Sequence, residues 1–155
     1  MEKGKTCFFT GHREIPESDE RDIFLKVSGF IEQLYQNGFC NFIAGGAIGF
    51  DTLAAKAVIA AKETHPDIKL HICIPCKGQD KYFSPEQKAD YSLILSVADS
   101  TEILYEHYVR GCMQTRNRRM VDLSGIGIAY CTKPTGGTAY TVSYAEKNDV
   151  KILYV

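Results

Sequence analysis

The chain has 155 residues, 45% of them hydrophobic and 24% charged, and its formal net charge at pH 7 is -1. This balance excludes a disordered or fibrous chain, and the length is typical of one globular domain with a single core. We therefore expect one domain over residues 1–155, and the small net charge excludes a broad basic surface for nucleic acid.

The sequence shows neither a membrane segment nor a metal motif. Its longest apolar stretches, such as 53–61 and 68–75, fall well short of the roughly 20 residues that a membrane span requires. The charged start runs straight into a predicted strand, so we expect a cytoplasmic protein without a signal peptide or a membrane partner. Most cysteines lie in predicted buried strands, and Cys73-Ile74-Pro75-Cys76 lacks a second pair for zinc, so we expect reduced thiols and no metal.

Strands and helices alternate along the whole chain. The predicted strands are short apolar runs that end at glycine, proline or polar residues, and in chain order they lie at 7–9, 39–44, 68–74, 101–105, 126–131 and 150–155. The predicted helices have apolar residues at helical spacing, and they run from a cap at Ser18 or Asp19 to Asn37, then over 51–65, 85–97, 112–123 and 138–147. Ser84-Pro85-Glu86-Gln87 has the pattern of a capping box at the start of the third helix.

This alternation predicts an α/β fold of Rossmann-like type. The expected architecture is a doubly wound, mostly parallel sheet of about six strands between two layers of helices, with right-handed crossovers. In such sheets, ligands bind beyond the carboxyl ends of the strands, where the strand order reverses. With the order 3-2-1-4-5, that crevice would lie between the first strand, 7–9, and the fourth, 101–105.

The first glycine-rich loop, Gly-Gly-Ala-Ile-Gly-Phe-Asp at 45–51, lies between a predicted strand and a predicted helix. Gly45, Gly46 and Gly49 would let backbone N–H groups approach an anion at the positive end of the helix. The spacing G-G-x-x-G differs from the dinucleotide fingerprint, and a purely structural turn would use the same glycines. Asp51 is either the helix cap or a contact to a ribose hydroxyl or base.

A second glycine-rich loop follows the fifth predicted strand and also places a hydroxyl residue at the start of a helix, as Gly136-Gly137-Thr138. A turn requirement explains either loop alone. Two such loops at the same edge of the sheet favour a bound phosphate. Gly11-His12-Arg13 directly follows the first strand, which places an imidazole and a cation near the expected crevice. The alternative is a solvated Arg13 and a His12 that bonds only to backbone.

The helix at 112–123 carries an arginine on its inward face. At 100° per residue, Arg116 and Asn117 share a face with two methionines, Met113 and Met120. An arginine in that position needs an anionic partner, which is either a structural carboxylate or a ligand phosphate held by two hydrogen bonds. We favour the ligand.

In their order and their positions at strand ends, these segments resemble the SLOG superfamily of Rossmann-like domains, and most closely its YpsA-like branch of bacterial proteins. The resemblance covers nearly the whole chain. The superfamily also contains the LOG-type phosphoribohydrolases, which cleave nucleoside monophosphates at the N-glycosidic bond, and the DNA-processing protein DprA (Smf), which binds single-stranded DNA. The resemblance therefore implies a nucleotide-related ligand and leaves both of these activities as alternatives.

The hydrolase motifs match only in part. Met113, Arg116 and Met120 are similar to the M-x-x-R-K-x-x-M segment of the LOG-type enzymes, with Asn117 in place of the lysine. The second motif, P-G-G-x-G-T-x-x-E, has its glutamate replaced here by Thr141, so the carboxylate that would act beside the ribose is missing. The catalytic candidates that remain are Arg116, with Glu106 or Asp51 as a substitute carboxylate.

We therefore expect a sensor or carrier of a nucleotide-type small molecule. A nucleoside monophosphate, ADP-ribose and an NAD-like dinucleotide all fit the site, so no particular cofactor is assigned. Hydrolysis of a nucleotide is the second hypothesis. DprA-like binding of single-stranded DNA is the third, because the net charge disfavours a nucleic-acid partner. A homo-oligomer is compatible with the sequence.

Overall fold

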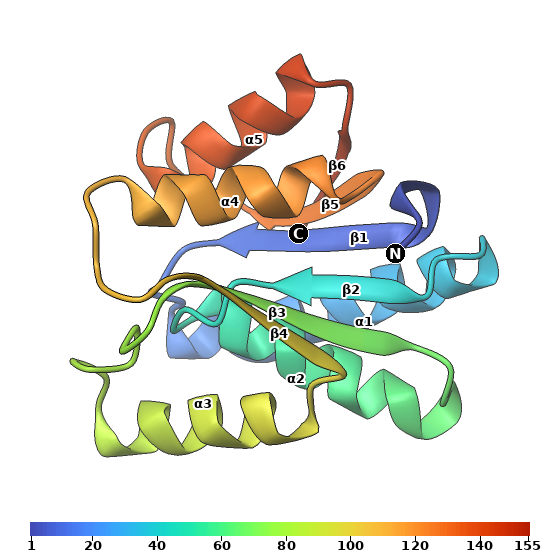
Figure 1. The fold of residues 1–155 in the computed structure, drawn as a ribbon. Coiled ribbons are helices and arrows are strands. Elements are labelled where there is room, and N and C mark those ends of the chain that lie inside the picture. Colours follow the sequence, from blue (N-terminus) through green and yellow to red (C-terminus); the bar gives the residue numbers. More distant parts are fainter.

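A single six-stranded sheet forms the centre of the molecule (Figure 1). The computed structural model describes all residues, 1–155. The strands are β1 (Thr6–Gly11), β2 (Asn41–Ala44), β3 (Lys69–Cys76), β4 (Ser100–Tyr105), β5 (Ile126–Tyr130) and β6 (Lys151–Tyr154). All neighbouring strands are parallel, in the order β4-β3-β2-β1-β5-β6. The predicted α/β, Rossmann-like fold is therefore confirmed.

Five α-helices cover the two faces of this sheet. They are α1 (Glu20–Gln36), α2 (Phe50–Thr64), α3 (Pro85–Val97), α4 (Cys112–Asp122) and α5 (Gly137–Lys147), and 3₁₀ turns at Lys3–Lys5 and Glu17–Asp19 precede β1 and α1. Helices α1, α2 and α3 lie on one face, and α4 and α5 lie on the other (Figure 1), which gives the expected three layers. None of these helices is both long enough and apolar enough to cross a lipid bilayer.

The core is split by the sheet because neighbouring residues of a strand point to opposite faces. Phe9 packs with the apolar sides of α1 and α2, whereas Phe8 packs with residues of α4 and α5 such as Met120 and Ala145. Both phenylalanines are fully buried, and Cys7 pairs in register with Phe42 of β2 and Ile126 of β5. The central strands are thus apolar on both faces, as expected for a parallel sheet covered by helices.

Among the five α-helices only α3 has a side-chain cap at its N-terminus, and Asp19, the N-cap residue of α1, makes no capping hydrogen bond. Ser84 accepts a hydrogen bond from the Gln87 N–H at 3.2 Å, and the Gln87 side chain accepts one from the Ser84 N–H at 2.9 Å, so the predicted capping box is confirmed. The suggestion that Asp51 caps α2 is wrong, because the cap residue is Gly49, with φ 76°, and Asp51 lies inside the first turn.

The expected strand order is wrong in one respect. β4 lies at the edge of the sheet beside β3, and the strand next to β1 is β5. After β4 the chain passes to the opposite face and returns across the sheet as α4 (Figure 1). The strand order therefore reverses between β1 and β5. The crevice of the fold lies there, and not between the first and the fourth strand.

Candidate functional site

A cavity of about 400 Å³ lies at this reversal, between the loops that follow β1 and β5 and the inward face of α4. Most of the predicted site residues line it together: Gly11, His12, Arg13, Asp51, Arg116, Asn117, Gly136, Gly137 and Thr138. Four segments far apart in the sequence, around 11–13, 51, 116–117 and 136–138, thus meet in one place. The cavity is also lined by Ala47, Met113 and Lys133.

Arg116 forms one wall of the cavity and is 4% exposed. Its Nε donates to the Asn117 side-chain oxygen at 2.8 Å, and its Nη1 donates to the carbonyl of Gly45 and, at 3.5 Å, to that of Cys73. Its Nη2 has only the Met113 sulfur, at 3.8 Å, which is a weak acceptor. The guanidinium is therefore held in place by the residue that follows β2, by β3 and by its own helix, and one nitrogen is left without an oxygen partner.

Asp51 is the one carboxylate of the cavity, and it lies close to Arg116 without forming an ion pair within 4 Å. A Cβ on Gly45 would lie 2.7 Å from both the Asp51 Oδ2 and the Arg116 Nη1, so the absence of a side chain on Gly45 lets the two groups approach. Burial raises the pKa of Asp51, and the positive charge of Arg116 partly opposes this shift. Asp51 also accepts a hydrogen bond from the Ala47 N–H at 3.2 Å.

His12 joins the two loops that border the cavity. Its Nε2 accepts a hydrogen bond from the Thr132 N–H at 2.8 Å, and its ring packs edge-on against Tyr130, with ring centroids 5.3 Å apart. Accepting this bond places the proton of the neutral imidazole on Nδ1. Burial, and then the nearby charge of Lys133, lower the pKa of His12. Both effects favour the neutral ring that the hydrogen bond requires.

The second glycine loop, at 136–137, lies where the cavity meets the N-terminus of α5. Gly136 has φ 102°, a conformation that side chains disfavour. Gly137, the first residue of α5, has no positive φ, and a Cβ there would meet no atom within 4 Å. Neither backbone conformation nor packing therefore requires glycine at this position, which lies at the N-terminus of a helix beside the cavity.

The first glycine loop is explained by packing. A Cβ on Gly49 would lie 2.3 Å from the Arg13 carbonyl oxygen, and one on Gly46 would lie 3.0 Å from the Gln79 side chain. Gly45 approaches Arg116 and Asp51 in the same way. Gly45, Gly46 and Gly49 do not line the cavity, which this loop reaches only through Ala47 and Asp51. Their role in phosphate binding stays a prediction, and the geometry accounts for them as structural glycines.

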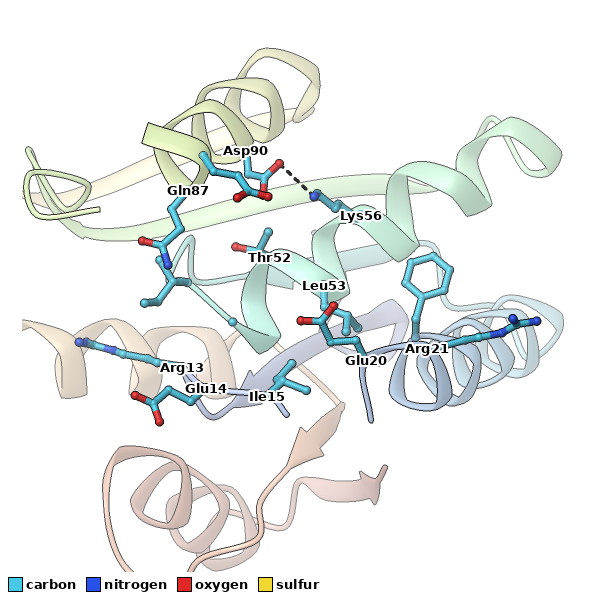
Figure 2. A pocket seen from close by; sticks show the side chains of 14 residues that line it. Arg13, Glu14, Ile15, Glu20, Arg21, Thr52, Leu53, Lys56, Gln87 and Asp90 are labelled. Atoms are coloured by element: carbon cyan, nitrogen blue, oxygen red, sulfur yellow. Dashed lines mark ion pairs between the residues drawn. The ribbon is translucent and has the colours of Figure 1, made fainter. Parts of the chain in front are cut away.

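Arg13 lies where the cavity meets two further hollows, and its side chain has no hydrogen-bond or ion-pair partner. The larger of these hollows, about 680 Å³, lies among α1, α2 and α3 (Figure 2). Figure 2 shows Arg13 and Glu14 at one end, Arg21 at the other, and the ion pair of Lys56 with Asp90, 2.9 Å apart, between α2 and α3.

The cavity and this hollow differ in the charged side chains that line them. The hollow contains four carboxylates, of Glu14, Glu20, Glu86 and Asp90, and three cations, of Arg13, Arg21 and Lys56. The cavity contains the cations of Arg13, Arg116 and Lys133 against the single carboxylate of Asp51. The cavity therefore attracts an anion, whereas the hollow in Figure 2 does not.

The structure does not bring Glu106 into the site. Its carboxylate is exposed and pairs with Lys77 at 2.9 Å, and it does not line the cavity. Thr141 is fully buried and donates to the Gly137 carbonyl at 2.8 Å. Sequence reasoning missed Lys133, which lies in the loop after β5. Knowing that β5 neighbours β1 would have singled out this loop as the border of the crevice.

The fold and the cavity together define a Rossmann-like α/β protein with a cationic, glycine-bordered site at its switch point. The YpsA family model, described as the YspA SLOG family, matches residues 22–155. The chain belongs to this family. It is 37% identical over 136 residues to the uncharacterized SPbeta prophage-derived protein YoqJ of Bacillus subtilis (strain 168), covering 79% of each chain.

More distant relatives and solved structures agree. UPF0398 protein BH1768 of Halalkalibacterium halodurans is 29% identical over 117 residues, which cover 74% of this chain and 62% of the relative. DNA processing protein A (DprA) from Streptococcus pneumoniae superposes with a TM-score of 0.69 at 18% identity, over 98% of this chain and 50% of that one. DprA from Helicobacter pylori, whose structure describes a single-stranded DNA binding mode, gives 0.67 at 17% identity, over 98% and 65%. These structures share the fold, and the chain spans only part of their length.

Proposed function

We propose that the cavity binds a nucleotide or nucleotide-derived ligand through its phosphate, and that the protein senses or carries this ligand. The observation that carries the proposal is Gly137, a glycine that neither backbone conformation nor packing requires, at the N-terminus of a helix that borders a cationic cavity. The free N–H groups of the first turn of α5 and the dipole of that helix favour a negative group there.

Arg116 supports the same ligand class. Its Nη2 lacks an oxygen acceptor while the rest of the guanidinium is fixed by Asn117 and two carbonyls. A phosphate oxygen would supply that acceptor through a charge-assisted hydrogen bond. Because the side chain is already ordered, it loses little conformational freedom when the ligand binds. Arg13 and Lys133 add positive charge at the open side of the cavity.

The chemistry of the cavity favours binding over hydrolysis. N-glycosidic cleavage develops positive charge on the sugar carbon, which an ionised carboxylate stabilises. The position that would hold this carboxylate in the hydrolase motif is Thr141, whose hydroxyl is used within the first turn of α5. Asp51 is the carboxylate that remains, and it is bonded to the Ala47 N–H and lies beside Arg116.

The test combines ligand capture with a matched pair of glycine variants. Native mass spectrometry of protein purified without added nucleotide, and thermal shifts with AMP, ADP-ribose and NAD, would identify the ligand class by its stabilisation of the folded protein. Gly137→Ala should keep the fold and lower the affinity for the ligand at least several-fold. The ligand-induced rise in melting temperature should therefore be smaller than in the wild type. Gly29→Ala is the control, because Gly29 also lies in a helix with open space around it but far from the cavity.

Two results would overturn the proposal. One is the absence of any shift with all three ligands. The other is an equal shift in Gly137→Ala and Gly29→Ala. A single-stranded oligonucleotide belongs in the same panel. Sub-micromolar binding whose logarithm falls steeply with the logarithm of salt would favour DNA as the physiological partner.

A further inference from the structure

A third hollow, of about 640 Å³, opens beside the cavity and shares Arg13, Ala47 and Met113 with it. It is bordered by Cys76 at the end of β3 and by the loops that follow β3 and β4, at 77–83 and 107–108. Because both loops follow the carboxyl ends of parallel strands, the hollow opens at the same edge of the sheet as the cavity. A ligand in the cavity can therefore extend into it past Arg13.

Three aromatic rings line this hollow, and two of them are largely exposed. Tyr82 is 89% exposed and Tyr108 is 67% exposed, and neither hydroxyl is hydrogen-bonded to the protein. The Phe83 ring packs edge-on against the Tyr91 ring, with centroids 5.6 Å apart. Tyr82 and Tyr108 stack on no other aromatic ring of the chain, so each offers a flat face for a planar aromatic group.

The charges around these rings are positive. Lys77 and Lys81 line the hollow together with Arg13, and no aspartate or glutamate lines it. The Lys81 Nζ lies 5.3 Å from the centroid of the Tyr82 ring. Lys77 pairs with Glu106 outside the hollow, so Lys81 and Arg13 are the cations left without a carboxylate partner. The surface suits an aromatic group joined to an anion.

We propose that this hollow is a second subsite that takes a nucleobase, so that the ligand consists of two nucleosides joined through phosphate. This inference rests on the proposed function of the cavity. The cavity alone, at about 400 Å³, already has the size of a small-molecule site, so the hollow provides room beyond a mononucleotide. Arg13, which lines both, contacts the linking phosphate, and Tyr82 or Tyr108 stacks on the second base.

The test compares one-base and two-base ligands on the same proteins by isothermal titration calorimetry. Probes are AMP, the 5′-phosphorylated dinucleotide pApA and NAD, so that phosphodiester and pyrophosphate linkages are distinguished. In the wild type at least one two-base probe should bind five- to a hundredfold tighter than AMP, the range for stacking one base on an aromatic ring. Tyr82→Leu or Tyr108→Leu should remove that advantage and leave AMP affinity unchanged.

Matched variants separate stacking from a general loss of tyrosine. Tyr82→Phe and Tyr108→Phe should keep the advantage because the ring remains. Tyr154→Leu, at a 51%-exposed tyrosine of β6, should leave all affinities unchanged. Equal binding of one-base and two-base probes to the wild type would overturn the second subsite and leave the phosphate site intact. Equal weakening of AMP and pApA by the leucine variants would show that one mononucleotide spans both spaces, which also overturns it.

A spectroscopic readout is available because the chain contains no tryptophan. Tyr82→Trp and Tyr108→Trp each introduce a unique fluorophore that retains a flat ring. A base stacked on that ring should quench the fluorescence of at least one variant when pApA or NAD is added. Quenching by AMP to the same extent, or no quenching of either variant by a two-base probe that binds, would contradict the proposal.

Discussion

His12 and Thr132 lie on opposite sides of the strand reversal and are joined by a hydrogen bond from the Thr132 N–H to the His12 Nε2, at 2.8 Å. This bond closes the edge of the cavity between the loops after β1 and β5. It exists only while the imidazole is neutral, because a protonated ring has no acceptor nitrogen. The border of the cavity is therefore sensitive to pH.

The first prediction concerns this pH dependence. Burial lowers the pKa of His12, so its contribution to stability is fully present above the ordinary histidine value of 6.5 and is lost as the pH falls through the lower pKa of the folded state. His12→Gln keeps an acceptor oxygen and cannot titrate. The wild type should lose more unfolding free energy than His12→Gln between pH 7.5 and pH 5, measured by urea denaturation. His71, whose pKa burial also lowers, is present in both proteins and cancels in the comparison. Identical pH profiles would contradict the assignment.

The second prediction separates a glycine that packing requires, Gly49, from Gly137, the glycine proposed to border the ligand. Gly49→Ala places a Cβ 2.3 Å from the Arg13 carbonyl oxygen at a φ of 76°, so strain and overpacking should together cost about 2 to 4 kcal/mol of unfolding free energy. Gly137→Ala, with open space and an ordinary φ at the start of a helix, should change it by less than about 1 kcal/mol. Urea denaturation measures both. Comparable losses in the two variants would show that the second loop is also determined by packing.

The third prediction tests the electrostatics of the cavity with sulfate, an anion whose charge does not change near neutral pH. Asp51→Asn keeps an oxygen that can accept from the Ala47 N–H and removes the one carboxylate that lines the cavity. Sulfate should bind roughly three- to tenfold tighter, on the scale of about 1 kcal/mol for like charges in a partly hydrated site. Calorimetric titration measures the affinity. Weaker sulfate binding by the variant would mean that Asp51 orders the site instead of repelling the anion.

The fourth prediction concerns catalysis. Incubation of the wild type with nucleoside monophosphates should release no free base above the background of Arg116→Lys, because the carboxylate of the hydrolase motif is replaced by Thr141. Chromatography of the products measures the base directly. Turnover by the wild type that Arg116→Ala abolishes while binding persists would contradict this and would assign the carboxylate role to Asp51, since Glu106 lies outside the cavity.

Apolar spacing and caps predicted the elements because these signals are local. All six strands and five helices lie within a few residues of their expected positions, and the Ser84–Gln87 capping box is present. The strand order was not predictable in this way. It depends on the face across which the chain returns after β4, and both possible returns leave the same apolar pattern in the strands.

The site was predicted in part for a similar reason. The inward face of α4 follows from helical periodicity, so Arg116 was correctly placed between Met113 and Met120. Gly49 and Gly137 could not be distinguished, because both are glycines of strand-to-helix loops, and the sequence does not show which of them another part of the backbone approaches closely. Only the positions of neighbouring atoms, such as the Arg13 carbonyl oxygen, separate the two causes.

The return of the chain from β4 to α4 has a consequence for the order of folding. The bond from Arg116 to Gly45 spans 71 positions, and the bond from Thr132 to His12 spans 120. Closing such long loops costs entropy that is recovered only when the distant partners dock. A nascent chain emerging from the ribosome can assemble β1, β2, β3 and their helices first, but the proposed anion site is incomplete until α4 and the loop after β5 have been synthesised. Capture of the proposed ligand by a growing chain would therefore report that β5 has joined β1, before the edge strand β6 is added.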